Sequence, residues 1–278
     1  MYPVFMILRQ SMNKIIIYMA SLILICIIAV SIMAAYLYYN PPKERAFYQI
    51  PPHDDTLRIA YIGDSWAYIH QNEHKCLIPT MIEDSCNIPT RIYSYGYPGR
   101  TSKEIYEAMY DDEEQKKILQ NFGYDYCIVS AGINDANKKM SFNYYRNSID
   151  LIIRFLLSNH VHPIILEIPD YNIFKTYSWQ RRDRKLLYRI SMIINQVPLD
   201  CKQIFRNKLK ESFHNKNYQE KVSLIRYKSW NKNYDKDLNT LYRIDGIHLN
   251  NYGNSILDSV IAEEIISKIK KNHDYRHK

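Results

Sequence analysis

Five residues, spread between positions 65 and 248, have the side chains or backbone groups that acyl transfer requires. Ser65 offers a hydroxyl nucleophile, His248 can act as its general base, and Asp245, three residues earlier, can orient the imidazole ring. The backbone N–H groups of Ser65 and Gly99 and the side-chain amide of Asn134 could together stabilise an oxyanion. These residue types point to a reaction in which a serine attacks an ester or a related acyl group.

Each of these residues lies in a short block that follows an expected strand or precedes the last expected helix. The blocks are Gly63–Ser65, Gly96–Ser102, Gly132–Asp135 and Asp245–His248. Short apolar runs predict five strands, and helical spacing of apolar residues predicts helices between them. The expected strands are 57–61, 91–94, 126–130, 163–168 and 222–226, and the expected helices include 102–119, 143–158 and 251–270. This alternation is typical of a parallel sheet covered by helices on both faces, whose ligands bind beyond the carboxyl ends of the strands.

Glycine is scarce, and its placement supports the same blocks. The chain has 7 glycines in 278 residues, whereas a typical soluble protein of this length has about 19. Five of the seven lie in the four blocks, where a side chain would obstruct the approach of backbone or substrate. Within the second block, both Gly96 and Gly99 could supply the backbone donor.

The content and order of the four blocks resemble those of the SGNH/GDSL hydrolase family. The matching motifs are Gly-Asp-Ser at Ser65, Pro-Gly-Arg-Thr-Ser at Gly99, Gly-Ile-Asn-Asp at Asn134 and Asp-Gly-Ile-His-Leu at His248. The resemblance covers residues 57–269 and favours Gly99 over Gly96, because Thr-Ser follows Gly99 as the family pattern expects. Trp66 departs from the pattern, which often has a small or polar residue there. No Gly-x-Ser-x-Gly motif of the α/β-hydrolase type is present.

The resemblance implies an α/β fold, a three-layer α/β/α sandwich with a five-stranded parallel sheet of the flavodoxin-like kind. It also implies a catalytic triad of Ser65, Asp245 and His248, and an oxyanion hole formed by Ser65, Gly99 and Asn134. It implies no metal and no other cofactor. The implied reaction is the hydrolysis of esters or thioesters.

A long apolar segment precedes the expected hydrolase domain. Residues 15–39 contain no charged residue and are long enough to span a bilayer, whereas the apolar core of a signal peptide has about 7–15 residues. We therefore predict a basic N-terminus at 1–14, an uncleaved single-pass transmembrane signal anchor at 15–39 and a linker at 40–55. The hydrolase domain, 56–273, is expected outside the cytoplasm, followed by a tail at 274–278. The alternatives are cleavage after Ala29-Val30-Ser31 and a buried helix of a soluble protein.

Composition excludes several other classes of protein. Hydrophobic residues make up 46% and charged residues 24% of the chain, which argues against intrinsic disorder and low complexity. The net charge of +8 suits anionic partners, but no nucleic-acid recognition motif accompanies it, so no nucleic-acid binding is expected. The cysteines form no CxxC pair, and ordinary free or buried thiols are favoured over a Cys76–Cys86 disulfide.

The expected substrate is an ester of a small acyl group, O-acetyl above all, on a cell-surface glycan. This expectation depends on the predicted anchor, on the 26 tyrosines of the chain and on the breadth of the family. One alternative is an O-acetyltransferase that uses the same triad and passes the acyl group to a sugar hydroxyl. The other is a non-catalytic glycan-binding module, which would not need the complete set of Ser65, Asp245 and His248.

The remaining histidines give weaker signals. His70 and His74 lie one helical turn apart, a spacing that suits metal ligands. Because the sequence shows no third ligand, the favoured interpretation is a surface or rim helix, and no metal site is predicted. His160 and His162, at the start of the fourth expected strand, are interpreted as structural or exposed, and His214 as solvated.

The segment 170–220 is longer than one crossover between strands needs. It contains several aromatic residues followed by the basic run 181–185, so a cap over the active site is one interpretation. The favoured interpretation is an amphipathic helix with a solvated basic side. That helix would pack its apolar side on the core, through Leu186, Leu187, Ile190 and Ile194.

Overall fold

The computed structural model describes residues 2–39, 55–111, 123–215, 218 and 220–276. The chain divides into two units, 1–40 and 41–278. The first unit is the helix α1 (Tyr2–Tyr39), which begins well before the predicted span. Its Met12–Met33 portion has a mean hydropathy of 2.9 and is long and apolar enough to cross a membrane, a property that signal sequences share. The predicted linker, 40–55, lies outside the described residues except for Asp55.

The second unit is built on a five-stranded parallel sheet, as predicted. The strand order is β2-β1-β3-β4-β5, and every neighbouring pair is parallel. The strands are β1 (Leu57–Gly63), β2 (Thr90–Gly96), β3 (Tyr126–Ser130), β4 (His162–Leu166) and β5 (Ser223–Ile225). Because β2 and β3 lie on opposite sides of β1, the direction of winding reverses beside β1, where open sheets of this type bind their ligands.

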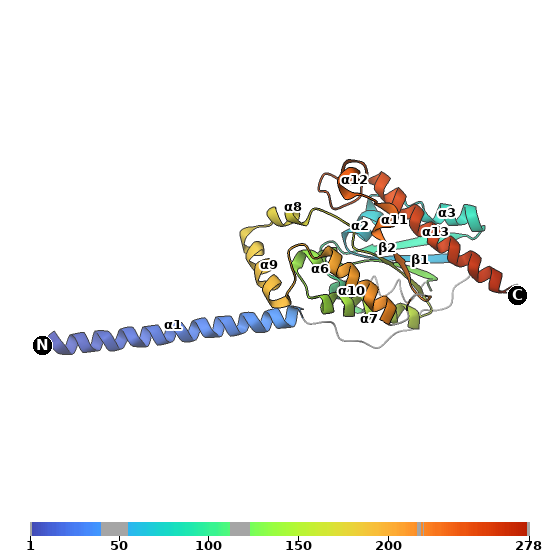
Figure 1. Cartoon of the computed structure of the whole chain (residues 1–278). Helices are drawn as coiled ribbons and strands as arrows, with labels where there is room; N and C mark the ends of the chain where they lie inside the picture. Colours follow the sequence, from blue (N-terminus) through green and yellow to red (C-terminus); the bar gives the residue numbers. More distant parts are fainter. Residues whose placement is uncertain (1, 40–54, 112–122, 216–217, 219, 277–278) are drawn as a thin grey trace. The chain divides into compact units, whose positions relative to one another are not determined.

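Helices cover both faces of the sheet and complete a three-layer α/β/α sandwich (Figure 1). On one face lie α2 (Ser65–Asn72), α3 (Ile78–Cys86), α11 (Tyr227–Trp230) and α13 (Asn251–Arg276). On the other lie α6 (Ile133–Lys138), α7 (Phe142–Ser158) and α10 (Lys202–Asn215), and α4 (Ser102–Asp111) packs against α7. The remaining helices are α8 (Ile173–Ser178), α9 (Arg182–Asn195) and α12 (Tyr234–Leu241). The helix predicted at 102–119 corresponds to α4, and its part beyond Asp111 lies outside the described residues.

The central strands are continuous apolar segments because helices cover them on both sides. Every residue of β3 is buried, as are the last five of β1, and most of these residues are apolar. The register pairs Gly63 with both Gly96 and Ser130. The carboxyl ends of β1, β2 and β3 therefore lie side by side, which brings the first three sequence blocks to one edge of the sheet.

The helix α9 is oriented differently from the prediction. Leu186, Leu187, Ile190 and Ile194 were expected to pack on the core, but they are 59%, 58%, 43% and 52% exposed. The helix contacts the body through its other side, where Ser191 is buried and the Asn195 amide donates a hydrogen bond to the Lys139 carbonyl at 2.7 Å. The expectation was wrong because an apolar stripe shows that a helix has two faces but does not show which face the fold covers.

A pair of leucine-to-alanine substitutions tests this orientation. Leu151, in the middle of α7, is 3% exposed, whereas Leu187 is 58% exposed. Leu151→Ala is expected to lower the free energy of unfolding by about 2–5 kcal/mol, and Leu187→Ala by no more than about 0.5 kcal/mol. Denaturant unfolding of the full chain in detergent measures both. A loss at Leu187 as large as that at Leu151 would show that the core covers the apolar face of α9.

Candidate active site

The structure brings Ser65, His248 and Asp245 into one hydrogen-bonded line. The Ser65 Oγ lies 2.8 Å from His248 Nε2, and His248 Nδ1 lies 2.6 Å from Asp245 Oδ2. Asp245 Oδ1 accepts two further hydrogen bonds, from the backbone N–H groups of Ile247 at 2.8 Å and His248 at 3.0 Å. This is the arrangement of a nucleophile, a base and a group that orients the base.

Ser65 owes its position to the junction between β1 and α2. Asp64 caps the helix, because its Oδ1 accepts the Trp66 N–H at 3.0 Å. Ser65 is therefore the first residue of α2, and an N–H in the first turn of a helix has no acceptor within that helix. The hydroxyl and a free backbone donor thus belong to the same residue at the edge of the sheet.

A short tied loop holds His248 in front of α13. The Arg243 N–H donates to the His248 carbonyl at 2.7 Å, and the Gly246 N–H donates to the Arg243 carbonyl at 2.8 Å. Gly246 has a φ of +67°, a left-handed conformation that favours glycine. The loop is fixed by its own backbone, so the imidazole has little freedom to leave Ser65.

The charge of Asp245 fixes the tautomer of His248. Partial burial acts to raise the pKa of Asp245, but the hydrogen bonds from the His248 ring and from the two backbone N–H groups outweigh it and lower the pKa to about 2. The carboxylate is therefore ionised at neutral pH and accepts the proton on Nδ1. This leaves Nε2 as the acceptor for the Ser65 hydroxyl proton.

The two glycines that could supply a backbone donor, Gly96 and Gly99, have different surroundings in the structure. A Cβ at Gly96 would collide with the backbone of Tyr68 on α2, so this glycine is needed for the packing of β2 against α2. Gly99 is exposed, has a φ of +79°, and a Cβ there would meet nothing within 4 Å. Gly99 therefore has the open surroundings and the backbone conformation that a substrate-facing donor needs.

Asn134 lies against the loop that contains Gly99. Its Nδ2 donates to the Arg100 carbonyl at 2.9 Å, and a primary amide has a second N–H to offer. The same two blocks are joined a second time, because Asp135 accepts hydrogen bonds from the Ser102 N–H at 2.8 Å and the Ser102 hydroxyl at 2.6 Å. These links hold the Gly99 loop and the Asn134 side chain in one unit.

The positioning role of Asp135 was not identified from the sequence, although Asp135 and its partner Ser102 both belong to the motifs. Asp135 is fully buried, and burial raises its pKa to about 6 against the opposing hydrogen bonds from Ser102. The signal was present: an acidic residue follows Asn134 after β3, and a serine follows Gly99 after β2. Because β2 and β3 both flank β1, polar residues after their ends meet beside it.

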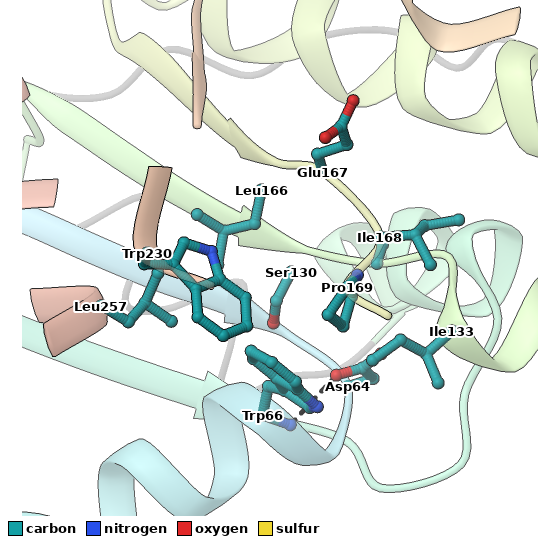
Figure 2. Close-up of a pocket in the computed structure, with 11 residues that line it drawn as sticks. Asp64, Trp66, Ser130, Ile133, Leu166, Glu167, Ile168, Pro169, Trp230 and Leu257 are labelled. Carbon is teal, nitrogen blue, oxygen red and sulfur yellow. Dashed lines mark hydrogen bonds between the residues drawn. The ribbon is translucent and has the colours of Figure 1, made fainter. Parts of the chain in front are cut away.

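A small cavity lies beside Asp64 and Trp66, the two neighbours of Ser65 in the chain (Figure 2). Its volume is about 10 Å³, and Asp64, Trp66, Ser130 and Trp230 are among its lining residues. Neither Ser65 nor His248 lines it, so it is not the position of a reacting acyl group. Burial raises the pKa of Asp64 to about 7, against the hydrogen bond from Trp66. Asp64, which caps α2 next to Ser65, therefore carries only part of a negative charge at neutral pH.

Asp64→Asn is expected to reduce the pH dependence of stability. Because the pKa of Asp64 rises from 3.8 to about 7 in the fold, the folded state keeps a proton there that the unfolded state loses. The contribution of Asp64 to the free energy of unfolding is therefore greatest below about pH 4, and it is lost as the pH rises toward 7. Asparagine keeps an oxygen for the Trp66 N–H and never ionises. Denaturant unfolding measures the difference in the free energy of unfolding between about pH 5 and about pH 8. This difference should be smaller for Asp64→Asn than for Asp55→Asn, a control at an exposed residue. Equal differences in the two variants would contradict the raised pKa of Asp64.

The other histidines and the cysteines differ partly from expectation. The surface interpretation of His70 and His74 was wrong, because both side chains are buried, and each bonds to Asp258 on α13. His162 bonds to the Ser223 hydroxyl at 2.9 Å. His160 and His214 are exposed. All five cysteines are free, including Cys76 and Cys86.

Comparison with known proteins identifies the fold through solved structures. No model of a protein family matches the chain, and no curated protein matches it by sequence. An acetyl xylan esterase superposes with a TM-score of 0.53 at 18% identity, over 75% of this chain and 100% of that one. The lipase/acylhydrolase from Enterococcus faecalis superposes with a TM-score of 0.52 at 16% identity, over 76% and 96%. A variant of an acetyl-xylooligosaccharide esterase from Geobacillus gives 0.51 at 14% identity, over 75% and 94%. The body of the chain therefore has the fold of the SGNH/GDSL hydrolases.

Proposed function

We propose that the chain is a serine esterase whose catalytic residues are Ser65, His248 and Asp245. The observation that carries this proposal is the unbroken hydrogen-bonded line from the Ser65 hydroxyl through the His248 ring to the Asp245 carboxylate. A protein that only binds its ligand has no need of this line. Gly99 follows the end of β2, and Asn134 lies in the first turn of α6 after β3, so both can supply donors for the oxyanion at the edge of the sheet beside β1.

In the proposed reaction, the Ser65 Oγ attacks the acyl carbon while its proton passes to His248 Nε2. The carbonyl oxygen becomes an oxyanion that accepts hydrogen bonds from the Ser65 N–H, the Gly99 N–H and the Asn134 amide. The alcohol leaves with the proton from His248, and Ser65 remains acylated. Water then attacks the acyl-enzyme and gives its proton to His248, which passes that proton to the Ser65 Oγ as the acyl–Oγ bond breaks and the acid is released.

We infer that the substrate is a small acyl ester, O-acetyl above all, on a cell-surface glycan. Two of the solved structures that share the fold are acetyl esterases of xylan or xylo-oligosaccharides by name. The inference also assigns 15–39 to a single-pass anchor and places the hydrolase domain, 56–273, outside the cytoplasm. External protease should then degrade the body in intact cells, and full protection would contradict this location.

Acetate release tests the substrate class. Purified full-length protein is incubated with acetylated xylo-oligosaccharides and, separately, with an ester of a long-chain acid. Release of acetate well above the rate of long-chain hydrolysis is expected. Cleavage of the long-chain ester alone would contradict the proposed acyl group, and transfer of acetyl to added sugar without net acetate release would make the protein a transferase.

A further inference from the structure

A second cluster of chemically active side chains lies between the end of α2 and the middle of α13. It consists of His70 on α2, His74 and Cys76 in the segment that follows, and Asp258 on α13. The side chains of His70 and His74 are 2% and 3% exposed, and that of Asp258 is 0% exposed. The triad does not use these residues, since the cluster lies farther along α2, about 8 Å of helix rise beyond Ser65.

Asp258 is the centre of the cluster. Its Oδ1 lies 2.9 Å from His70 Nε2, and its Oδ2 lies 2.9 Å from His74 Nε2. The Leu77 backbone N–H donates to the same Oδ2 at 2.8 Å. The ligand atoms of His70, Cys76 and Asp258 all lie within 4.8 Å of one another. An imidazole nitrogen, a sulfur and a carboxylate oxygen thus converge on one point, where His70 and Asp258 are buried and Cys76 is half-buried.

We propose that this cluster binds a zinc ion through His70 Nε2, Cys76 Sγ and Asp258 Oδ1. Nitrogen and sulfur ligands together suit zinc, whereas magnesium and calcium prefer oxygen ligands alone. His74 and the Leu77 N–H hold the other carboxylate oxygen and so orient Asp258. On the far side of the His70 ring, Nδ1 faces the Ser94 hydroxyl of β2 at 3.4 Å. Metal-binding histidines and carboxylates usually have such outer partners.

The distances allow zinc to enter with small movements. Around a tetrahedral zinc ion, neighbouring ligand atoms are about 3.3–3.5 Å apart, given bonds of about 2.0 Å to nitrogen and oxygen and about 2.3 Å to sulfur. The contact between His70 and Asp258, at 2.9 Å, must open by about 0.4 Å. The sulfur must approach, and Cys76 lies in the irregular segment between α2 and α3, which can adjust. Binding releases the thiol proton, because the thiolate is the ligand.

Such an ion would join the two helices next to the proposed catalytic residues. Helix α2 begins at Ser65, and α13 begins at Asn251, soon after His248. A metal link between His70 and Asp258 therefore restrains α2, which begins at Ser65, relative to α13, which follows His248. The role inferred for the metal is structural, and it holds whether or not the chain hydrolyses esters.

Metal titration of the full-length protein in detergent tests this site. After treatment with a chelator, the protein is expected to bind about one Zn²⁺ per chain and to gain thermal stability on loading. Co²⁺ in its place should give a near-ultraviolet charge-transfer band, which requires a thiolate ligand. Cys76→Ala should lose that band, whereas Cys86→Ala, at a half-buried cysteine outside the cluster, should keep it. His74→Ala is expected to weaken Zn²⁺ binding by about 10–100-fold, the usual effect of losing an outer partner.

Two results would overturn the proposal. The first is a folded wild-type protein that binds no Zn²⁺ in the titration, which would make the cluster a hydrogen-bonded network only. The second is a cobalt band that is unchanged in Cys76→Ala, which would place the metal on another cysteine, or a zinc affinity that is unchanged in both Cys76→Ala and His70→Ala, which would place the metal outside the cluster. Neither result depends on ester hydrolysis, so the zinc site and the proposed esterase activity can fail separately.

Discussion

Replacing Ser65 by alanine is expected to lower kcat for ester hydrolysis by about 10⁴- to 10⁶-fold. The substitution removes the only atom that forms the acyl-enzyme bond in the proposed mechanism. The fold should remain, because Ser65 is only partly buried and its partner is the His248 side chain, which is 24% exposed. Some activity over the uncatalysed rate should persist, since the oxyanion donors do not depend on the Ser65 side chain.

Labelling by a fluorophosphonate probe measures the same residue without knowledge of the substrate. The wild-type chain should be labelled and Ser65→Ala should not. Ser259→Ala is a suitable control, because that hydroxyl lies on α13 and donates only to the Ser255 carbonyl of the same helix among its described contacts. Labelling of folded Ser65→Ala, or no labelling of folded wild type, would contradict the assignment of the nucleophile.

Asp245→Asn is expected to lower kcat by about 10⁴-fold and to change KM little. The asparagine oxygen can still accept the Ile247 and His248 N–H groups that now bond to Oδ1, so the loop should keep its shape. What changes is the group that faces His248 Nδ1. An amide N–H in that place favours the tautomer with its proton on Nε2, which cannot accept the proton of Ser65.

The comparison with Asp235→Asn makes this prediction specific. Asp235 is an exposed residue of α12, and its loss should change kcat less than about twofold. Because the pKa of Asp245 is lowered to about 2, the carboxylate stays ionised above about pH 3, so loss of activity at mildly acidic pH should not originate from Asp245. Near wild-type kcat in Asp245→Asn would show that another group orients the base.

Much of the fold and of the candidate site could be predicted from the sequence because both depend on local patterns. The third strand was predicted with the observed bounds, Tyr126–Ser130, since a short buried strand is a continuous apolar run between turn residues. That the first three sequence blocks lie at one edge of the sheet could be predicted because the carboxyl ends of neighbouring parallel strands lie side by side.

Other features depend on contacts that no local pattern records. His70 and His74 had the spacing of metal ligands, but their partner, Asp258, lies 188 residues after His70 and on another helix. The outward apolar face of α9 could not be predicted either, because periodicity does not show what a face meets. The resemblance already favoured Gly99 over Gly96, but the physical reason, which is the backbone angle of Gly99 and the packing of Gly96, needed the structure.

The separation of 183 residues between Ser65 and His248 has a consequence for how the protein is made. Synthesis proceeds from the N-terminus, so the serine leaves the ribosome long before the histidine and before α13, which packs on α3. In the proposed mechanism, a nascent chain that contains only β1 and α2 holds the nucleophile without its base and is inactive. Proteolytic loss of the C-terminal segment would return the mature protein to that state. The proposed activity therefore requires a chain that extends through His248 and into α13.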